Sequence, residues 1–450
     1  MPDDIARLDI GTNGRYFYDT YRAVNRTLSA MHLSQVVLLS MLSFSFPEED
    51  TKLKEVALTY SRDIAPIFQA HCQGCHRPGE IGEMPLMSYE EVRPWVRSIR
   101  KAVKTAQMPP WGADPRYGKF KNDVSLSKED INKITKWIDD GAAEGDSKDL
   151  PPPRKFTPGW VIGKPDAVFS MQEAFEVPAK GTIPYKYFVV PTGFKEDRWI
   201  RAAEVRTGAR DVVHHVIVFV SEPEDRKKKG VTATPEARAR GLFFSNLLCG
   251  TAPGEGPDFF PPGSAKLVKA GSDLIFQCHY TPNGKPATDR SKVGFIFAKK
   301  PVRRVYTRAA LNSWFKIPPG EKSHKVVSKH VFRQDIWLVS LMAHMHLRGK
   351  SFRFDLYPPG EKKRTLLNVP DWDFNWQTHY LLDKPLSIPA GSRVECTAYF
   401  DNSAGNPANP DPAGWVRWGD QTWEEMMIGY LNFVRQDESP VRPGDSNSDN

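Results

Sequence analysis

The chain has 450 residues, which is more than one ordinary hydrophobic core accommodates, so two or three domains are expected. Its 38 proline and 32 glycine residues favour many short strands over a helical bundle, and no apolar run is long enough for a membrane-spanning helix. The net charge of +8 comes from interleaved basic and acidic residues, so we expect a solvated surface and no nucleic-acid partner.

Residues 1–50 are predicted to be a leader segment. The stretch from Met31 to Ser45 has a short apolar core that ends in small residues, as in a signal peptide. Because 30 residues precede Met31, either the region ahead of the core is unusually long or translation starts at Met31. An ordinary buried helix or strand is the alternative. The signal-peptide interpretation predicts a periplasmic or secreted protein.

Residues 51–150 have the pattern of a helical domain. Ser127 and Asp130 form a capping box ahead of a helix whose apolar residues fall on one face. A second helix is predicted over 92–103, although a proline inside it makes its start ambiguous. The proline-rich stretch 150–154 that follows is predicted to be a stiff linker.

From residue 159 onward, short runs rich in β-branched and aromatic residues alternate with proline and glycine turns. This pattern is typical of antiparallel sandwiches, and its length suits two, at 159–300 and 301–435. The polar tail 436–450 lacks periodicity and is predicted to be disordered. The clearest predicted strands are 187–190, 212–220, 274–280 and 293–298.

Cys72, Cys75 and His76 form a C-x-x-C-H motif, which is typical of covalent haem attachment. One helical turn would present both thiols to the haem vinyl groups and His76 to the iron. A zinc knuckle would need a second ligand pair nearby, and a thioredoxin-type dithiol would need a βαβ context. The surrounding sequence offers neither, so a haem c is predicted. Its attachment normally takes place outside the cytoplasm, in agreement with export.

The sixth iron ligand is expected to be a methionine, and Met84, Met87 and Met108 compete for this position. Met108 precedes two prolines that would hold its loop stiffly. The stretch from Ser61 to the helix that contains Trp137 resembles a small class I cytochrome c domain, and this resemblance favours Met108. Ligation by histidine and methionine suits electron transfer.

Five histidines fall in three short clusters on predicted strands, namely His214 with His215, His279, and His344 with His346. Neutral imidazoles on rigid strands suit copper and zinc. His344 and His346 share one strand face, whereas the adjacent His214 and His215 need a bulge or a strand end to reach one metal ion. Each pair by itself is equally compatible with an ordinary core or surface role.

The stretch from Gly159 to Tyr430 resembles the copper type II, ascorbate-dependent monooxygenases, which include the peptidylglycine and dopamine hydroxylases. The resemblance implies two jelly-roll-like sandwiches, each holding one copper ion, on either side of a solvent cleft. The matching segments are His214-His215, Gln277 to Tyr280, His344-Met345-His346, Trp376-Gln377, Asp401-Asn402-Ser403, Asn406 to Pro410, Trp418 to Thr422 and Trp423 to Met427.

The same resemblance assigns three ligands to each copper ion. The electron-transfer copper would be held by His214, His215 and His279, and the oxygen-binding copper by His344, His346 and Met426. Met427 is the adjacent competitor. A thioether favours Cu(I), the state that must meet O2. Gln277 shares a strand face with His279 and either bridges toward the second copper or is an ordinary cleft-facing amide.

The resemblance also bears on the substrate, because this sequence differs at some substrate-binding positions from the family members that amidate peptides. Those members bind a peptide carboxylate with an arginine, an asparagine and a tyrosine. Met342 and Ile428 occupy the first two positions here, and only Tyr430 remains. We therefore expect a neutral or apolar small-molecule substrate. Arg348 could in principle replace the missing cation, but it shares a strand face with His344 and His346, and a supporting or surface role is expected for it.

The expected fold is an α-helical cytochrome c-like domain followed by two all-β jelly-roll-like sandwiches. The expected function is a copper-dependent monooxygenase that hydroxylates a C–H bond with O2. An external donor would supply electrons through the tethered haem. The alternatives are a non-catalytic haem and copper electron-transfer or copper-handling protein, and a structural sandwich with incidental histidines.

Overall fold

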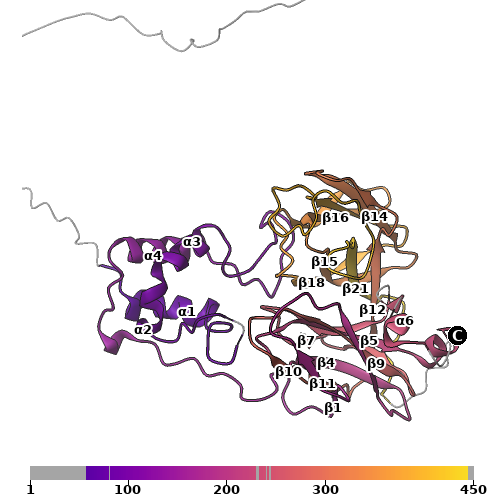
Figure 1. The fold of residues 1–450 in the computed structure, drawn as a ribbon. Coiled ribbons are helices and arrows are strands. Elements are labelled where there is room, and N and C mark those ends of the chain that lie inside the picture. Colours follow the sequence, from indigo (N-terminus) through magenta and orange to yellow (C-terminus); the bar gives the residue numbers. More distant parts are fainter. Residues whose placement is uncertain (1–56, 81, 230–232, 240, 243–244, 444–450) are drawn as a thin grey trace, which may run out of the picture. The chain divides into compact units, whose positions relative to one another are not determined.

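The computed structural model describes residues 57–443 except 81, 230–232, 240 and 243–244. The predicted leader at 1–50 lies outside these residues. Helices occupy the N-terminal part of the described chain, and strands dominate the remainder (Figure 1). None of the helices in this part of the chain has the length and apolar character needed to cross a lipid bilayer.

The described residues before 150 form short helices around one small core. That core includes Tyr60, Phe68 and Trp137, whose rings are all buried. The helices are η1 (Tyr60–Ile64), α1 (Ala65–His71), α2 (Tyr89–Val92), η2 (Arg93–Trp95), α3 (Val96–Lys104), α4 (Lys128–Asp139) and η3 (Ser147–Asp149).

The local signals in this region act as predicted. The Ser127 hydroxyl accepts a hydrogen bond from the Asp130 backbone N–H at 3.0 Å and thereby caps α4. The predicted helix over 92–103 is divided, because Pro94 lies in the 3₁₀ turn η2 between α2 and α3. Proline has no backbone N–H to donate, so it is tolerated best at the start of a helical segment.

The first sandwich contains two antiparallel sheets, ordered β1-β11-β4-β8 and β3-β9-β5-β6, with β7 beside β4 and a separate β2-β10 ribbon. Two short helices, α5 (Pro223–Lys229) and α6 (Pro235–Ala239), follow β5. The strands are β1 (Ala167–Ser170), β2 (Phe175–Val177), β3 (Lys186–Pro191), β4 (Arg198–Arg206), β5 (Val213–Ser221), β6 (Leu247–Thr251), β7 (Asp258–Phe259), β8 (Ser264–Val268), β9 (Asp273–Tyr280), β10 (Ala287–Asp289) and β11 (Lys292–Phe297).

The second sandwich is built in the same way, from sheets ordered β12-β21-β15-β18 and β14-β19-β16-β17, with a small β13-β20 ribbon. Its strands are β12 (Arg303–Leu311), β13 (Lys316–Ile317), β14 (His324–Val331), β15 (Ile336–His344), β16 (Gly349–Tyr357), β17 (Arg364–Val369), β18 (His379–Ile388), β19 (Arg393–Phe400), β20 (Val416–Arg417) and β21 (Ile428–Arg435). The four strands predicted most clearly from the sequence correspond to β3, β5, β9 and β11.

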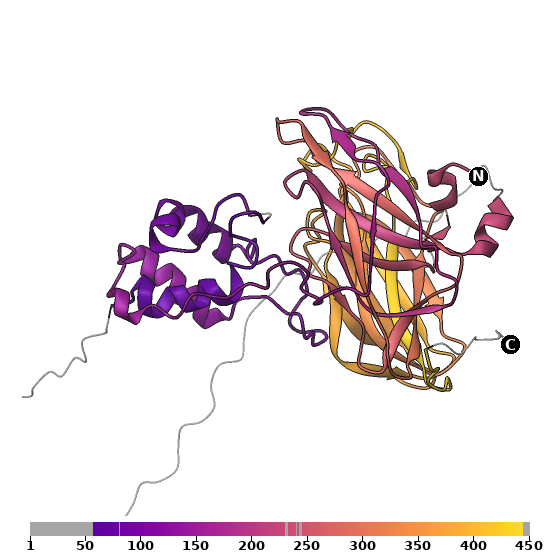
Figure 2. The ribbon, with the colours of Figure 1, turned by 90° about the horizontal axis from the view of Figure 1, so that it is seen from below.

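The two sandwiches share one nine-stranded sheet. β8 and β12 pair in parallel, with Ser264 opposite Arg303 and Ala265 opposite Arg304, so a sheet of the first sandwich continues into the second. Figures 1 and 2 show the strands of both sandwiches gathered in one β-rich body. The boundary predicted at Lys300 falls in the connection between β11 and β12. The chain is therefore mostly a double β-sandwich whose halves are joined through their backbones.

Each sandwich has its own hydrophobic core, and the three cysteines outside the C-x-x-C-H motif lie in these cores. Cys249 and Cys278 belong to the first core and Cys396 to the second, and all three are free thiols. Burial raises the pKa of the Cys249 thiol well above its usual value. These cysteines therefore act as small apolar side chains.

The segment 111–123 lies inside the range predicted for the helical domain, yet it contacts the second sandwich. The Asp114 backbone N–H donates to the Asn368 carbonyl oxygen at 2.8 Å, and the Asn122 side chain donates to the His379 carbonyl oxygen at 2.7 Å. These hydrogen bonds hold the linker between α3 and α4 against strands β17 and β18.

The predicted disorder of 436–450 is wrong for residues 436–443. Val441 and Val302 exchange two backbone hydrogen bonds of 2.8 and 2.9 Å, and the Gln436 side chain donates to the Ile336 carbonyl oxygen. Composition did not reveal this order because the segment is held by backbone groups rather than by apolar side chains.

The contact between β21 and its facing sheet gives a stability prediction. A Cβ at Gly429 would stand 2.5 Å from Cys396 Sγ and 2.8 Å from a Phe354 ring carbon. Gly429→Ala should therefore lower the free energy of unfolding by about 1–3 kcal/mol, measured by urea denaturation. Gly256→Ala is the matched control, because a Cβ there meets nothing within 4 Å. Equal stability of the two variants would contradict this packing.

Candidate metal centres

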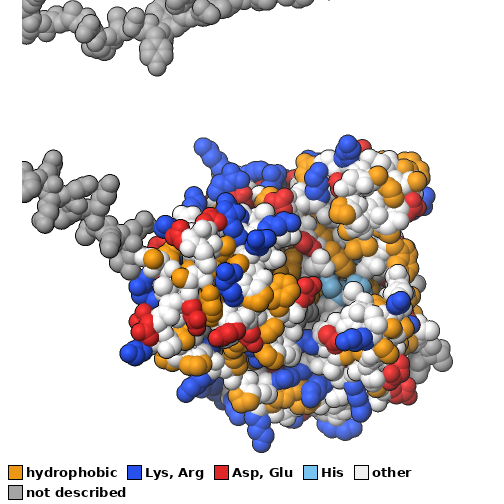
Figure 3. Space-filling view, turned by 60° about the vertical axis from the view of Figure 1, so that its left-hand side comes forward, with side chains coloured by type: hydrophobic (Ala, Val, Ile, Leu, Met, Phe, Trp, Pro, Cys, Tyr) orange, Lys and Arg blue, Asp and Glu red, His pale blue; other side chains and the backbone are white. Residues whose placement is uncertain are grey.

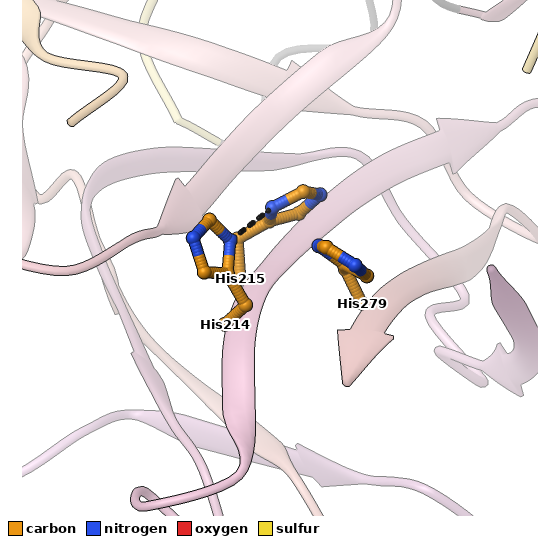
Figure 4. A group of neighbouring side chains, drawn as sticks. All are labelled: His214, His215 and His279. Atoms are coloured by element: carbon orange, nitrogen blue, oxygen red, sulfur yellow. Dashed lines mark hydrogen bonds between the residues drawn. The ribbon is translucent and has the colours of Figure 1, made fainter. Parts of the chain in front are cut away.

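His214, His215 and His279 converge where β5 begins. The register of β5 against β9 shifts between Val213 and His215, which makes His214 the extra residue of a β-bulge. His215 lies directly opposite His279. Figure 4 shows the three imidazole rings close together on these two strands. The bulge supplies the geometry that two adjacent histidines need to face one metal ion.

The nitrogens of these three rings have the spacing of a metal site. In the described chain, one ligand atom from each of the three lies within 4.8 Å of the others. His214 Nε2–H donates to Asn375 Oδ1 at 3.3 Å, and the Nδ1 atoms of His214 and His215 are joined by a hydrogen bond of 3.2 Å. Two nitrogens that each bind one ion at about 2 Å are separated by about this distance.

Burial favours neutral rings that can accept a metal ion. Desolvation lowers the pKa of His279 to about 3 and that of His215 well below its usual value. His215 Nε2 and His279 Nδ1 are buried without a hydrogen-bond partner in the described part of the chain. Neutral imidazoles with unsatisfied nitrogens fit a copper or zinc ion.

The second histidine pair lies at the end of β15. His344 Nδ1–H donates to Gln377 Oε1 at 2.6 Å, and His346 Nδ1–H donates to the Glu424 carbonyl oxygen at 3.3 Å. These bonds leave both Nε2 atoms as potential ligands, and His346 Nε2 is buried without a partner in the described residues. Burial lowers the pKa of His344 to about 4.

Met426 and Met427, the two residues before β21, belong to different clusters. Met342 and His344 pair with Tyr430 and Ile428, so these side chains share one face of the sheet. Met426 packs with Met342, Ile428 and Tyr430, whereas Met427 lies in the core of the second sandwich. Met426 is therefore on the histidine-bearing face, and Met427 points away from it.

Two aromatic rings lie between the histidine groups. The Tyr185 ring centroid is 5.0 Å from that of His279 and 6.3 Å from that of His346. Phe374 stacks on His214 at 5.2 Å and is 6.3 Å from His346. Figure 3 shows histidine side chains at the floor of a hollow in the molecular surface. Neither Tyr185 nor Phe374 carried a sequence signal, because their role depends on the facing of two sandwiches.

The carboxylate of Glu425 fixes the chain beside the second histidine pair. It accepts backbone hydrogen bonds from His346 at 2.8 Å and from Arg348 at 2.6 Å. Burial raises the pKa of Glu425 to about 8, although these bonds favour the charged form. The sequence motif contained Glu425, but nothing in its spacing indicated this positioning role.

Arg348 is buried and occupied by other residues of the chain. Its guanidinium donates to Asn402 Oδ1 at 2.8 Å and to the Trp423 carbonyl oxygen at 2.9 Å. The alternative of Arg348 as a surface residue or as an anchor for a substrate carboxylate is therefore not supported. Its contacts are structural, since they join three separate loops of the second sandwich.

Gln277 and Tyr430 are both buried. Gln277 Nε2 donates to the Tyr187 hydroxyl at 2.8 Å, so its amide is held by a neighbouring strand. Tyr430 packs beside Met426, and burial raises the pKa of its phenol. Tyr430 lies beside the second candidate metal centre, whereas Gln277 lies on the strand that carries His279.

The C-x-x-C-H motif forms one turn after α1. The His76 backbone N–H donates to the Cys72 carbonyl oxygen at 3.0 Å, and both cysteines are free thiols. His76 Nδ1–H donates to the Met84 carbonyl oxygen at 3.0 Å, which leaves Nε2 to ligate iron. This arrangement fits a haem group, with the ring oriented by a backbone carbonyl.

The same bond bears on the sixth ligand. Met84 supplies the backbone carbonyl oxygen that holds His76 Nδ1, and its side chain packs against the core of the helical region. Met87 and Met108 are not held by His76. Met108 is half-buried at the end of α3, with its backbone N–H bonded to the Ala102 carbonyl oxygen. Met108 remains the predicted ligand.

Comparison with known proteins gives no family assignment. No protein-family model and no curated protein matches the sequence. Similar solved structures include the STIV major capsid protein, at 8% identity and a TM-score of 0.25 over 60% of this chain and 97% of that one. The bacteriophage PM2 capsid protein P2 gives 7% and 0.26 over 61% and 99%, and PNGF-II gives 10% and 0.26 over 70% and 72%. Likeness at this level carries no functional argument.

The two histidine groups predict two separable copper sites. His215→Ala and His346→Ala should each reduce the copper content of the dialysed protein by about one ion per chain, because each removes a ligand from one group only. His324→Ala is the control, since that histidine belongs to neither group. Metal analysis after dialysis measures the content. Full copper content in His215→Ala would contradict the first site.

Proposed function

We propose that this chain is a copper-dependent monooxygenase that hydroxylates a C–H bond with O2 and receives electrons through a c-type haem. The observation that carries the proposal is the convergence of His214, His215 and His279, with buried nitrogens that lack partners. The resemblance of the histidine and methionine motifs to the copper type II monooxygenases supplies the reaction class. Covalent haem attachment implies a periplasmic or secreted location.

The two candidate copper sites differ in their donor atoms. Copper supplies the one-electron steps and the contact with O2 that this chemistry needs. The three imidazoles of the first group suit an ion that changes oxidation state and passes electrons on. His344, His346 and Met426 would offer a softer set that favours Cu(I). Gln377 and the Glu424 carbonyl hold the two imidazoles of that set in orientation, and Glu425 holds the backbone of His346.

An ion pair favours electron delivery from the haem to the first copper site. Glu80 follows His76 by four residues, and its carboxylate lies 2.8 Å from the Arg210 guanidinium. Arg210 precedes His214 by four residues. A tethered donor held beside its acceptor acts at high effective concentration. An external reductant would then need to reach only the haem.

The neighbourhood of Met426 supports a small apolar substrate. Met342, Ile428 and Tyr430 pack with Met426 in an apolar cluster. Arg348 already bonds to Asn402 and Trp423. A charged carboxylate placed here would lose its hydration without gaining a cationic partner.

Coupled oxygen uptake tests the proposal. The copper-loaded, haem-containing chain is reduced and incubated with candidate apolar substrates under labelled O2, and the products are analysed by mass spectrometry. One labelled oxygen atom per product molecule is expected. The Cys72→Ala/Cys75→Ala variant should lose covalent haem and the haem-dependent rate while it retains copper. Reversible reduction of both metals without substrate-dependent oxygen uptake would instead indicate an electron-transfer or copper-handling protein.

The two adjacent methionines should give distinct phenotypes. Met426→Ala should retain most of the copper, because His344 and His346 remain, but lose product formation. Met427→Ala should lower the free energy of unfolding by about 2–5 kcal/mol, because it leaves a cavity in the core. Product yield per copper ion and urea unfolding separate the two effects. Loss of activity per copper ion in Met427→Ala alone would reverse the ligand assignment.

Glycine-extended peptides should not be hydroxylated at a useful rate. Losing a charge-assisted contact to a carboxylate costs about 1.5–3 kcal/mol, and Met342 and Ile428 cannot replace it. The measurement is product formation with a glycine-extended peptide compared with its uncharged amide. Efficient conversion of the peptide acid would show that another cation binds the carboxylate.

A further inference from the structure

A cavity that is separate from the histidine groups lies where the two sandwiches meet. β8 and β12 pair at Arg303 and Arg304 and then diverge, and a cavity of about 410 Å³ lies between them and the neighbouring strands. Its walls come from β5, β6, β8, β12 and β21. This volume falls in the range of small-molecule sites.

Cations dominate the polar lining of this cavity. A single carboxylate, that of Glu222, stands among the lining residues and lies 3.1 Å from the Lys269 ammonium. The five basic side chains are Lys266, Lys269, Arg304, Arg308 and Arg435. Lys269 is paired with Glu222, and Arg435 approaches Glu438, so Lys266, Arg304 and Arg308 supply the excess positive charge of this cavity.

The three guanidinium groups that line the cavity lie around one aromatic ring. Arg435, Arg304 and Arg308 lie 4.3, 5.0 and 5.9 Å from the Tyr306 ring centroid. Arg435 approaches Glu438 at 3.5 Å, whereas Arg304 and Arg308 have no carboxylate within ion-pair distance among the described residues. Like charges held this close repel one another, so the arrangement is stabilised by any anion that binds between them.

A buried lysine forms part of the floor. Lys266 is 5% exposed, and its ammonium donates to the Leu247 and Leu248 carbonyl oxygens at 2.6 and 3.0 Å. Two of its three N–H groups are thereby used, and the side chain is fixed in position. Lys266 lines the same cavity as Arg304 and Arg308, so a fixed ammonium and two guanidinium groups together form a prearranged anion site.

We propose that this cavity binds a small organic dianion through phosphate or carboxylate oxygens. Planar guanidinium groups bind either kind of oxygen in a bidentate manner, and both are charge-assisted contacts. The cavity volume of about 410 Å³ suits a small molecule. The site is independent of the proposed monooxygenase function, because none of its lining residues is a candidate metal ligand.

Titration calorimetry on the full-length, copper-loaded chain tests this proposal. The probes are glycerol 3-phosphate and succinate, each compared with sodium chloride at the same ionic strength. Saturable binding of one molecule per chain is expected for at least one probe. Binding of glycerol 3-phosphate alone indicates a phosphate ester, binding of succinate alone a dicarboxylate, and binding of both the shared oxygen chemistry. No binding beyond the chloride control would overturn the proposal.

The matched variants are Arg304→Gln and Arg393→Gln. Arg393 also lies over a tyrosine ring, 4.4 Å from the Tyr357 centroid, but outside the cavity. Arg304→Gln should weaken probe binding about tenfold or more and raise the melting temperature of the ligand-free protein by relieving repulsion. Arg393→Gln should change neither affinity nor the response to the probes. Unchanged affinity in Arg304→Gln, or equal losses in both variants, would place the binding elsewhere.

Discussion

The parallel pairing of β8 with β12 is the constraint on which the rest of the arrangement depends. It joins the two sandwiches through backbone hydrogen bonds, so one sheet crosses the boundary between them. Tyr185 of the first sandwich and Phe374 of the second therefore lie between the two histidine groups. The divergence of the same two strands opens the cationic cavity. The histidine groups and the cationic cavity therefore both depend on this shared sheet and on the point where β8 and β12 diverge.

Within each half, the period-two alternation of strands decides which side chains meet. The bulge at His214 interrupts this alternation on β5 and brings two adjacent imidazoles toward His279. Met426 and Met427 directly precede β21, and they point to different sides: Met426 packs with Ile428 and Tyr430, and Met427 lies in the core of the second sandwich.

Buried polar groups set the second histidine pair in place. Glu425 accepts backbone N–H groups on both sides of Leu347, and Arg348 bonds to two further loops. A buried carboxylate or guanidinium is costly unless its hydrogen bonds are made, and removing one partner leaves the other unsatisfied. These hydrogen bonds hold the loop after β15 and the loop before β21 against each other. They thereby fix the position of His346.

The sequence by itself determined the local features of this protein. Capping by Ser127, the C-x-x-C-H turn, the main strands and the clustering of histidines follow from spacing and residue type, which act over a few residues. Only the tertiary structure decided which methionine shares the histidine face, that Arg348 is buried, and that residues 436–443 are ordered. These depend on strand register and on backbone partners distant in the sequence, which single-chain patterns do not encode.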